Sequence, residues 1–109
     1  MALTVKNLNS GQLTTTSTTT LYVVPTGKAA IVKNQRFVNR DTVAHTINIF
    51  YARAGTTQFQ LLPKNLSLAP NALVIDQDEL TLTAGDQIQG SVDSGTTLDF
   101  VISGIERDA

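Results

Sequence analysis

Apolar and polar residues alternate with a period of two along several stretches of the chain, and turn-forming residues interrupt this alternation at short intervals. The clearest stretch spans residues 43–53, where one face carries Val43, Ile47, Ile49 and Tyr51. Successive side chains of a β-strand point to opposite sides of a sheet, so this pattern predicts a strand with one side on a core. No apolar repeat of helical period continues beyond two turns, and no helix is predicted.

Further strands are predicted between the other turns. They span residues 28–38, 57–62, 72–75, 80–83, 87–92 and 97–105. Within 28–38 the apolar positions change parity, and a β-bulge near Asn34 would reconcile the two halves. In 57–62, Phe59 and Leu61 are expected to face inward. The last stretch has apolar residues on both faces, which predicts a central strand.

Two hairpins are predicted in the C-terminal half. Gly85 and Asp86 suit a tight reversal between 80–83 and 87–92. The Asp-Ser-Gly-Thr sequence that follows Val92 suits a second reversal into the last strand. The C-terminal half would then be an antiparallel meander.

The number of strands indicates the fold class. Eight or nine short strands in 109 residues favour two packed layers. We expect an all-β fold, an antiparallel two-sheet β-sandwich that is jelly-roll-like, with an extended N-terminal arm. An immunoglobulin domain is disfavoured because its usual Cys and Trp residues are absent. The Thr-rich stretch 13–20 fits an edge strand or extended arm better than a disordered linker, so residues 1–20 are assigned to such an arm or edge strand and 21–109 to the β-sandwich.

Length, charge and cysteine content narrow the class of function. A chain of this length forms one core and leaves no room for a second domain. The net charge of -1, from 8 Lys+Arg and 9 Asp+Glu, gives no field that would attract nucleic acid or an anionic membrane. Without cysteine, disulfides, thiolate catalysis and Cys-ligated metals are excluded. The N-terminus lacks a secretory signal and no apolar run is long enough to span a membrane, so we expect the chain to fold where it is made.

Few residues are candidates for catalysis or metal binding. His45 is the only histidine, and it shares a strand face with Ile47, which suits the edge of a packed face or an interface better than an active site. No Gly-x-Ser-x-Gly elbow accompanies this single base. The loop 76–79 (Asp-Gln-Asp-Glu) could offer oxygen ligands to Ca²⁺, but it lacks an EF-hand register and is better explained as a solvated acidic turn. We assign no catalytic, cofactor-binding or metal-binding residue and expect no enzymatic activity.

Two other patterns are assigned to structure. Gly27-Lys28 lacks the upstream glycine and the following Ser or Thr of a phosphate loop, so a turn is predicted there. A modest positive stripe could form from Lys28, Lys33, Arg36, Arg40 and Arg53. Nucleic-acid binding would also require exposed aromatic residues, whereas the core is expected to take Phe37, Phe50, Tyr51 and Phe59. Tyr22 is the one tyrosine not assigned to the core, and without Trp a sugar-binding platform is disfavoured.

The order of several segments resembles that of small β-sandwich virion proteins of tailed bacteriophages. The segments are residues 21–33 (LYVVPTGKAAIVK), 38–41 (VNRD), 47–51 (INIFY), 80–88 (LTLTAGDQI) and 101–106 (VISGIE). The likeness covers most of residues 20–106. Its motifs, such as Tyr-x-Val-Pro-x-Gly-Lys and Ala-Gly-Asp-x-Ile, are short sequences of turns and strands. They are more specific for the fold than for the function. Capsid decoration (cement) proteins and tail-associated proteins both occur in this group.

The resemblance implies a virion protein assembled in the bacterial host cytoplasm. Its partners would be the major capsid protein or other virion proteins, and further copies of itself in a dimer or trimer, with no nucleic acid or membrane partner. The expected function is that of a capsid decoration protein on the outer surface of the head. The alternative is a tail or tail-fibre module that contacts the host or other tail proteins. Residues 1–20 are expected to reach a neighbouring subunit or the shell by strand addition.

Overall fold

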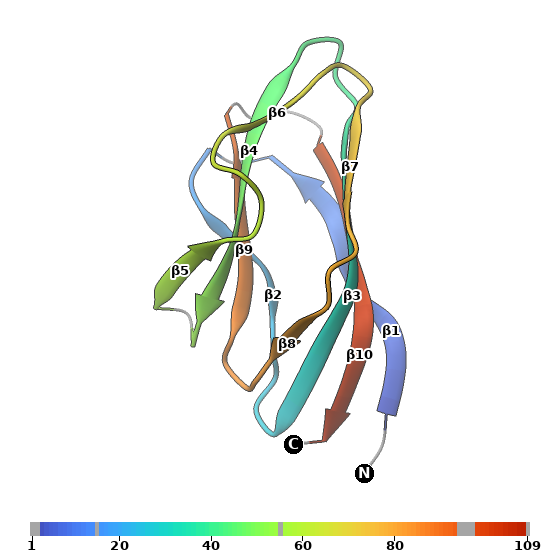
Figure 1. Cartoon of the computed structure of the whole chain (residues 1–109), viewed down its shortest axis with the longest axis vertical. Coiled ribbons are helices and arrows are strands. Elements are labelled where there is room, and N and C mark those ends of the chain that lie inside the picture. The colour runs from blue at the N-terminus through green and yellow to red at the C-terminus, as the bar shows by residue number, and fades with distance from the viewer. Residues whose placement is uncertain (1–2, 15, 55, 94–97, 109) are drawn as a thin grey trace.

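The structure, a computed structural model, describes residues 3–14, 16–54, 56–93 and 98–108, and every regular element in these ranges is a β-strand (Figure 1). The strands are β1 (Leu3–Leu13), β2 (Thr19–Val23), β3 (Lys28–Asn39), β4 (His45–Arg53), β5 (Thr57–Gln60), β6 (Leu66–Leu68), β7 (Leu73–Asp76), β8 (Leu80–Leu82), β9 (Gln87–Val92) and β10 (Leu98–Asp108). The predicted all-β class is confirmed. No helix that could cross a membrane occurs in the part of the chain just defined.

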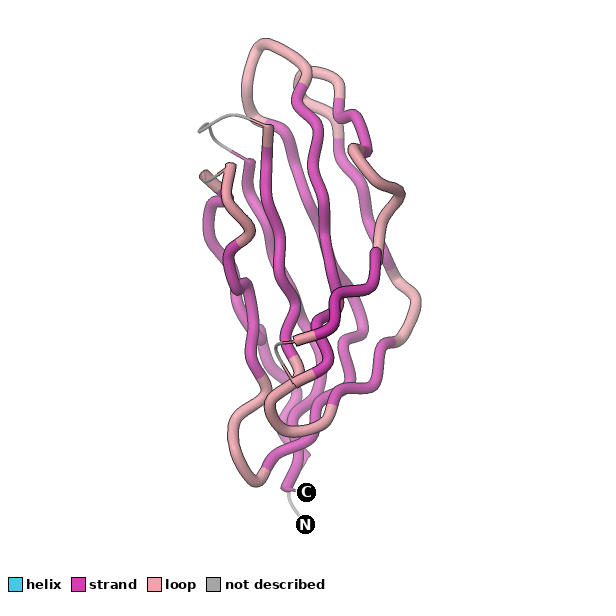
Figure 2. Tube along the Cα trace, turned by 90° about the vertical axis from the view of Figure 1, so that its left-hand side faces the viewer, coloured by secondary structure: helices cyan, strands magenta, loops and turns pink. Residues whose placement is uncertain are grey.

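The described strands form two antiparallel sheets that pack against each other (Figure 2). Sheet A contains β1, β10 and β3 in that order, with β7 and β8 both paired to the far edge of β3. Sheet B contains β2, β9 and β4, with β5 and β6 both paired to the far edge of β4. When β5 with β6, and β7 with β8, are each taken as one interrupted strand, successive strands lie in sheets A, B, A, B, B, A, B and A. The predicted two-sheet β-sandwich is confirmed.

The N-terminal strand β1 lies at one edge of sheet A. Residues 3–13, for which the sequence left an edge strand and an extended arm open, pair with β10 along their whole length. Leu8 is an extra residue in this pairing, and the neighbouring Asn9 side chain donates a hydrogen bond to the carbonyl oxygen of Leu21 on β2. This segment therefore belongs to the sandwich. Strand addition to a neighbour through the other edge of β1 stays a prediction.

Both predicted C-terminal hairpins are wrong. β8 pairs with β3 in sheet A, whereas β9 pairs with β2 and β4 in sheet B, so the turn at Gly85-Asp86 carries the chain across the core. The Gly85 N–H donates to the carbonyl oxygen of Val24, and the Val24 N–H donates to that of Asp86. These bonds fix the turn to the end of β2. The chain crosses back between β9 and β10, and residues 94–97 of the second predicted reversal lie outside the described residues.

The predicted bulge in β3 is confirmed. Asn34 pairs with Ser103 of β10 and Val32 pairs with Gly104, so Lys33 is the extra residue between them. A bulge lets one strand change the parity of its buried positions. Accordingly Ala30 and Val32 are buried before it, whereas Gln35, Phe37 and Asn39 are buried after it. β10 pairs with β1 on one side and β3 on the other, which confirms it as a central strand.

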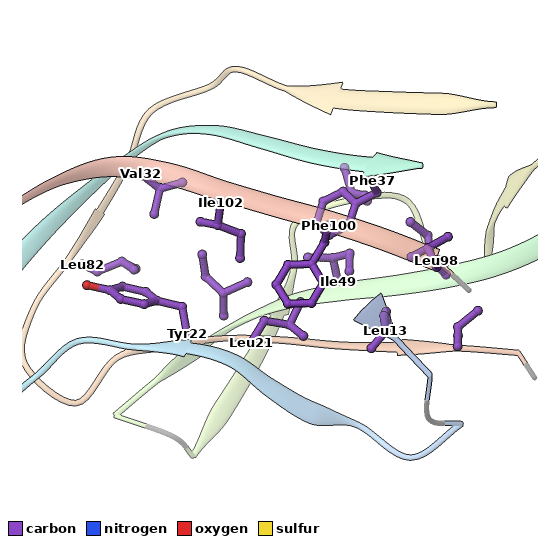
Figure 3. Packing of buried hydrophobic residues seen from close by; sticks show 14 of the residues in the cluster. Leu13, Leu21, Tyr22, Val32, Phe37, Ile49, Leu82, Leu98, Phe100 and Ile102 are labelled. Carbon is purple, nitrogen blue, oxygen red and sulfur yellow. The ribbon is translucent and has the colours of Figure 1, made fainter. Parts of the chain in front are cut away.

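The core lies between the two sheets and is lined from both of them (Figure 3). Its largest fully buried apolar residues are Leu13, Val24, Val32, Phe37, Ile47, Ile49, Leu82, Ile88, Leu98 and Ile102. Three residues expected to face the core do not lie in it. Phe50 is only partly buried and lies beside its pairing partners Gln60 and Gln89 on the outer surface of sheet B. Val43 is 55% exposed because β4 begins only at His45, so Val43 lies in the preceding loop. Phe59 is 45% exposed because β5 is a short strand that pairs only with β4, and all four of its residues are exposed.

Candidate interaction surfaces

His45 is held between two aspartates at the end of the sandwich where β3 connects to β4. Its Nδ1 lies 2.7 Å from Asp93 Oδ1 and its Nε2 lies 2.8 Å from Asp41 Oδ2. The fully buried Asn39 positions this loop, because its Oδ1 accepts a hydrogen bond from the Asp41 N–H and its Nδ2 donates to the Val43 carbonyl oxygen. Both ring nitrogens are therefore engaged by carboxylates. The structural role expected of His45 from its strand position stays a prediction that this geometry supports.

The two carboxylates favour the charged imidazolium of His45. Hydrogen bonds to Asp41 and then Asp93 raise the pKa of His45 above its ordinary 6.5, although burial opposes them. We expect the single histidine to titrate above pH 6.5 by NMR, with the midpoint moving down in Asp41→Asn and Asp93→Asn. Because the folded-state pKa is the higher one, the stabilisation is complete below pH 6.5 and is lost as pH rises through the folded-state pKa. A wild-type midpoint at or below 6.5 would contradict this assignment.

The acidic loop does not gather its carboxylates around one point. Asp76 Oδ1 accepts a hydrogen bond from the Asp78 N–H at 3.0 Å, which forms a local turn. Glu79 instead forms an ion pair with Lys33 in the neighbouring strand β3. No group of three or more metal-ligating side chains occurs among the described residues. The loop is therefore an acidic turn, and Glu79 at its end is bound to sheet A through Lys33.

The five basic residues of the middle segment do not form a continuous stripe. Lys28 pairs with Asp108 at 2.6 Å, and Arg40 lies 3.5 Å from Asp99. Lys33 is paired with Glu79, as described above. Arg53 lies over the Phe59 ring, 5.5 Å from its centroid, on the opposite sheet. Three of the five charges are thus paired with carboxylates, and the residues are distributed over both sheets.

A buried polar cluster that the sequence did not reveal lies where β1 and β2 face each other. Tyr22, although not predicted to be in the core, is buried, and its hydroxyl donates to Glu106 Oε2 at 2.5 Å. Lys6 Nζ donates to the other carboxylate oxygen at 3.2 Å. The hydrogen bond from Tyr22 lowers the pKa of Glu106, and burial together with this bond raises the pKa of Tyr22. The cluster borders an open groove of about 430 Å³ that Leu8 and Pro25 help to line.

The outer surface of sheet A is rich in aliphatic side chains. We call it the aliphatic face, and its aliphatic members are Val5, Ile31, Val38, Leu73, Ile75, Val101 and Ile105. They lie in rows across the strands, because Val5 pairs with Ile105 and Ile105 with Ile31. Exposure reaches 83% at Val5 and 38% at Val101 on the central strand. A polar row of Asn7, Ser103 and Asn34 divides these residues into two exposed aliphatic groups, which are candidate contact sites for another protein.

The outer surface of sheet B has a different chemistry. We call it the amide face, and its polar members are Thr20, Thr46, Asn48, Gln58, Gln60, Gln87, Gln89 and Ser91. None of these residues is charged, and several bind one another: Gln58 donates to Gln89 at 2.7 Å, and Gln89 donates to Gln87 at 2.8 Å. Thr20 donates to the same Gln87 oxygen at 2.8 Å. These polar groups thus bind one another, and Val23 and Phe50 are apolar members of the same face.

Comparisons with known proteins give only a distant structural similarity. No family model matches the chain, and no curated protein matches it. Two solved structures of a pentameric capsid protein isolated from metagenomic phage sequences match with 21% identity and a TM-score of 0.37. The match covers 92% of this chain but only 60% and 62% of the two solved chains, so this chain spans about three fifths of their length. A TM-score this low does not establish a shared fold.

Proposed function

We propose that this chain is a structural protein of a tailed-phage virion, and within that class a capsid decoration protein that binds the outer surface of the head and stabilises the shell. The observation that carries the proposal is the contrast between the two sheet faces. The aliphatic face is suited to contact with protein, and the amide face is suited to contact with water. A protein that adds contacts to a preformed shell needs both kinds of surface.

The chemistry of the described residues supports a role based on contacts. A protein that binds only the assembled shell stabilises it by mass action, and this requires no reacting group. The one histidine has both ring nitrogens bound by carboxylates, and the carboxylates of the acidic loop diverge. We therefore propose no enzymatic activity and no cofactor. The segment order that resembles tailed-phage virion proteins supports assembly in the host cytoplasm with other virion proteins.

A second candidate function is that of a tail or tail-fibre module, and one observation favours it. Phe59 projects from the β4–β5 hairpin, stacked on Tyr51 with ring centroids 5.8 Å apart and with Arg53 over it. Exposed aromatic and arginine side chains are typical of residues that anchor a protein to its partner. In a tail module this cluster would contact the host or another tail protein.

Imaging of purified particles of the phage that encodes this chain tests the proposal. Cryo-electron microscopy is expected to show the β-sandwich as density on the outer head lattice, in a fixed number per capsomer. Particles assembled without the chain are expected to lose this density and to release their DNA at a lower temperature. Density at the tail would favour the second candidate. Absence of the chain from washed particles would contradict both.

A further inference from the structure

We infer that the flank of the sandwich formed by β5, β6, β7 and β8 is a contact between two copies of this chain, related by a twofold axis. The axis would run along the seam, by which we mean the line on this flank where the edges of the two sheets face each other. The inference goes beyond the proposed function, because it assigns a self-contact to a surface that the proposed shell contact does not use.

The hydrophobic core reaches the surface at this flank. β5 and β6 end sheet B where β7 and β8 end sheet A, and β1 and β2 form the opposite flank (Figure 1). Several apolar residues pack against the core but stay partly exposed. All of them except Leu8 come from the segment 51–80, which builds this flank: Tyr51, Leu61, Leu66, Ala72, Val74 and Leu80. The seam is therefore incompletely covered here, and a partner would remove more of this apolar surface from water.

Phe59 provides a rigid apolar anchor beside the seam. It is 45% exposed, and its ring stacks on Tyr51 with centroids 5.8 Å apart. The Tyr51 hydroxyl donates to the buried Asp86 at 3.1 Å, and the Ala54 N–H of the β4–β5 turn donates to the same carboxylate at 2.9 Å. These bonds hold the hairpin in one arrangement. A preorganised aromatic side chain loses little conformational entropy on binding, so it suits an interface anchor.

The charges on the two sides of the seam are complementary and are not paired within one copy. Residues 42–75 contain no Asp or Glu, and their Lys and Arg residues are Arg53 and Lys64. Neither of these forms an ion pair with a described residue. On the sheet A side, Asp76 and Asp78 at the end of β7 also lack an ion pair within the described ranges. One side of the seam thus has unpaired positive charge and the other has unpaired negative charge.

A twofold axis along the seam brings these opposite charges together. Figure 1 shows β5 and the connection from β7 to β8 on opposite sides of the seam, at about the same level along the long axis of the molecule. Rotation by 180° about an axis parallel to the seam places β5 of one copy against this connection of its partner, twice in each dimer. The molecule measures 46 by 26 Å in this view, which leaves room for the ~800 Å² per partner of a specific interface. The occupant that fits the flank is therefore a second copy.

Sedimentation equilibrium of the full chain tests the inference with two charge reversals. Wild type is expected to dimerise. Arg53→Glu and Asp78→Lys are each expected to weaken self-association by about 10-fold or more, because each places like charges opposite each other. Charges are reversed because the loss of one exposed ion pair changes little. An equimolar mixture of the two variants is expected to regain the wild-type affinity, since both contacts of the mixed dimer again join opposite charges.

Arg36→Glu is the matched control. It reverses an exposed arginine that pairs with Val101 on the outer surface of sheet A, and it is expected to leave the dimer intact. A monomeric wild type, or a mixture that associates as weakly as the two separate variants, would overturn the inference. A monomeric chain that still binds heads would overturn this inference alone, and a dimer absent from particles would overturn the proposed function alone.

Discussion

Gly104→Ala is expected to lower the free energy of unfolding by roughly 3 kcal/mol, because an added methyl group has no room opposite the bulge in β3. A Cβ atom at Gly104 would lie 2.1 Å from the Ile31 carbonyl oxygen and 3.1 Å from Val32 Cα. These are backbone atoms of the adjacent strand and cannot move aside as a flexible side chain would. Chemical denaturation at neutral pH, followed by circular dichroism, measures the change.

Gly11→Ala is the matched control for this substitution. Gly11 also lies in a strand of sheet A, but the nearest atoms to an added Cβ are Phe100 ring carbons 3.7 Å away, which is ordinary van der Waals contact. We expect the free energy of unfolding to change by no more than about 0.5 kcal/mol. Equal losses in the two variants would show that close approach of β3 to β10 is not the reason for the glycine.

Asp86→Ala is expected to cost about 3 kcal/mol, because the Asp86 carboxylate binds several donors at the turn that carries the chain between the sheets. Its Oδ1 accepts a hydrogen bond from the Ala54 N–H at 2.9 Å. Its Oδ2 accepts bonds from the Thr83 N–H at 3.0 Å, the Thr83 hydroxyl at 3.2 Å and the Tyr51 hydroxyl at 3.1 Å. Removing the carboxylate leaves these donors without their acceptor. Urea unfolding of the variant beside wild type measures the loss.

The stability that the Asp86 carboxylate contributes is expected to depend on pH. Burial alone would raise the pKa of Asp86, but the hydrogen bonds from Thr83, Ala54 and Tyr51 outweigh it and hold the pKa below its ordinary value of 3.8. The contribution of Asp86 to stability is therefore present above about pH 4 and is lost as pH falls through the folded-state pKa. The difference between wild type and Asp86→Asn should shrink at acid pH. Asp78→Ala, an exposed control, is expected to change stability by less than about 0.5 kcal/mol, and a difference between wild type and Asp86→Asn that does not vary with pH would contradict the assignment.

The candidate surfaces were only partly predictable from the sequence. The strand face shared by His45 and Ile47 indicated that the histidine is structural, and the spacing of the acidic loop indicated a turn. The hydrogen bond between His45 and Asp93 could not be predicted, because Asp93 is 48 residues away and is brought close only by the pairing of β9 with β4. Tyr22 and Glu106 are 84 residues apart and meet because β2 and β10 lie in the two sheets that pack against each other. The aliphatic residues alternate along their strands, but only the sheet order places them on one surface.

The sequence by itself determined most of the local elements, although it did not predict β6 and left β1 open between an edge strand and an arm. Alternation with a period of two defined the strands, and the parity change within residues 28–38 located the bulge that the register at Lys33 shows. The tertiary structure alone decided which strands share a sheet. Two consecutive strands show the same alternation whether they pair with each other or lie in opposite sheets. Alternation with a period of two indicates only that one face of each strand is buried. The bonds of the Val24 main chain with Gly85 and Asp86 decide between the two outcomes, and such bonds form only when distant segments meet.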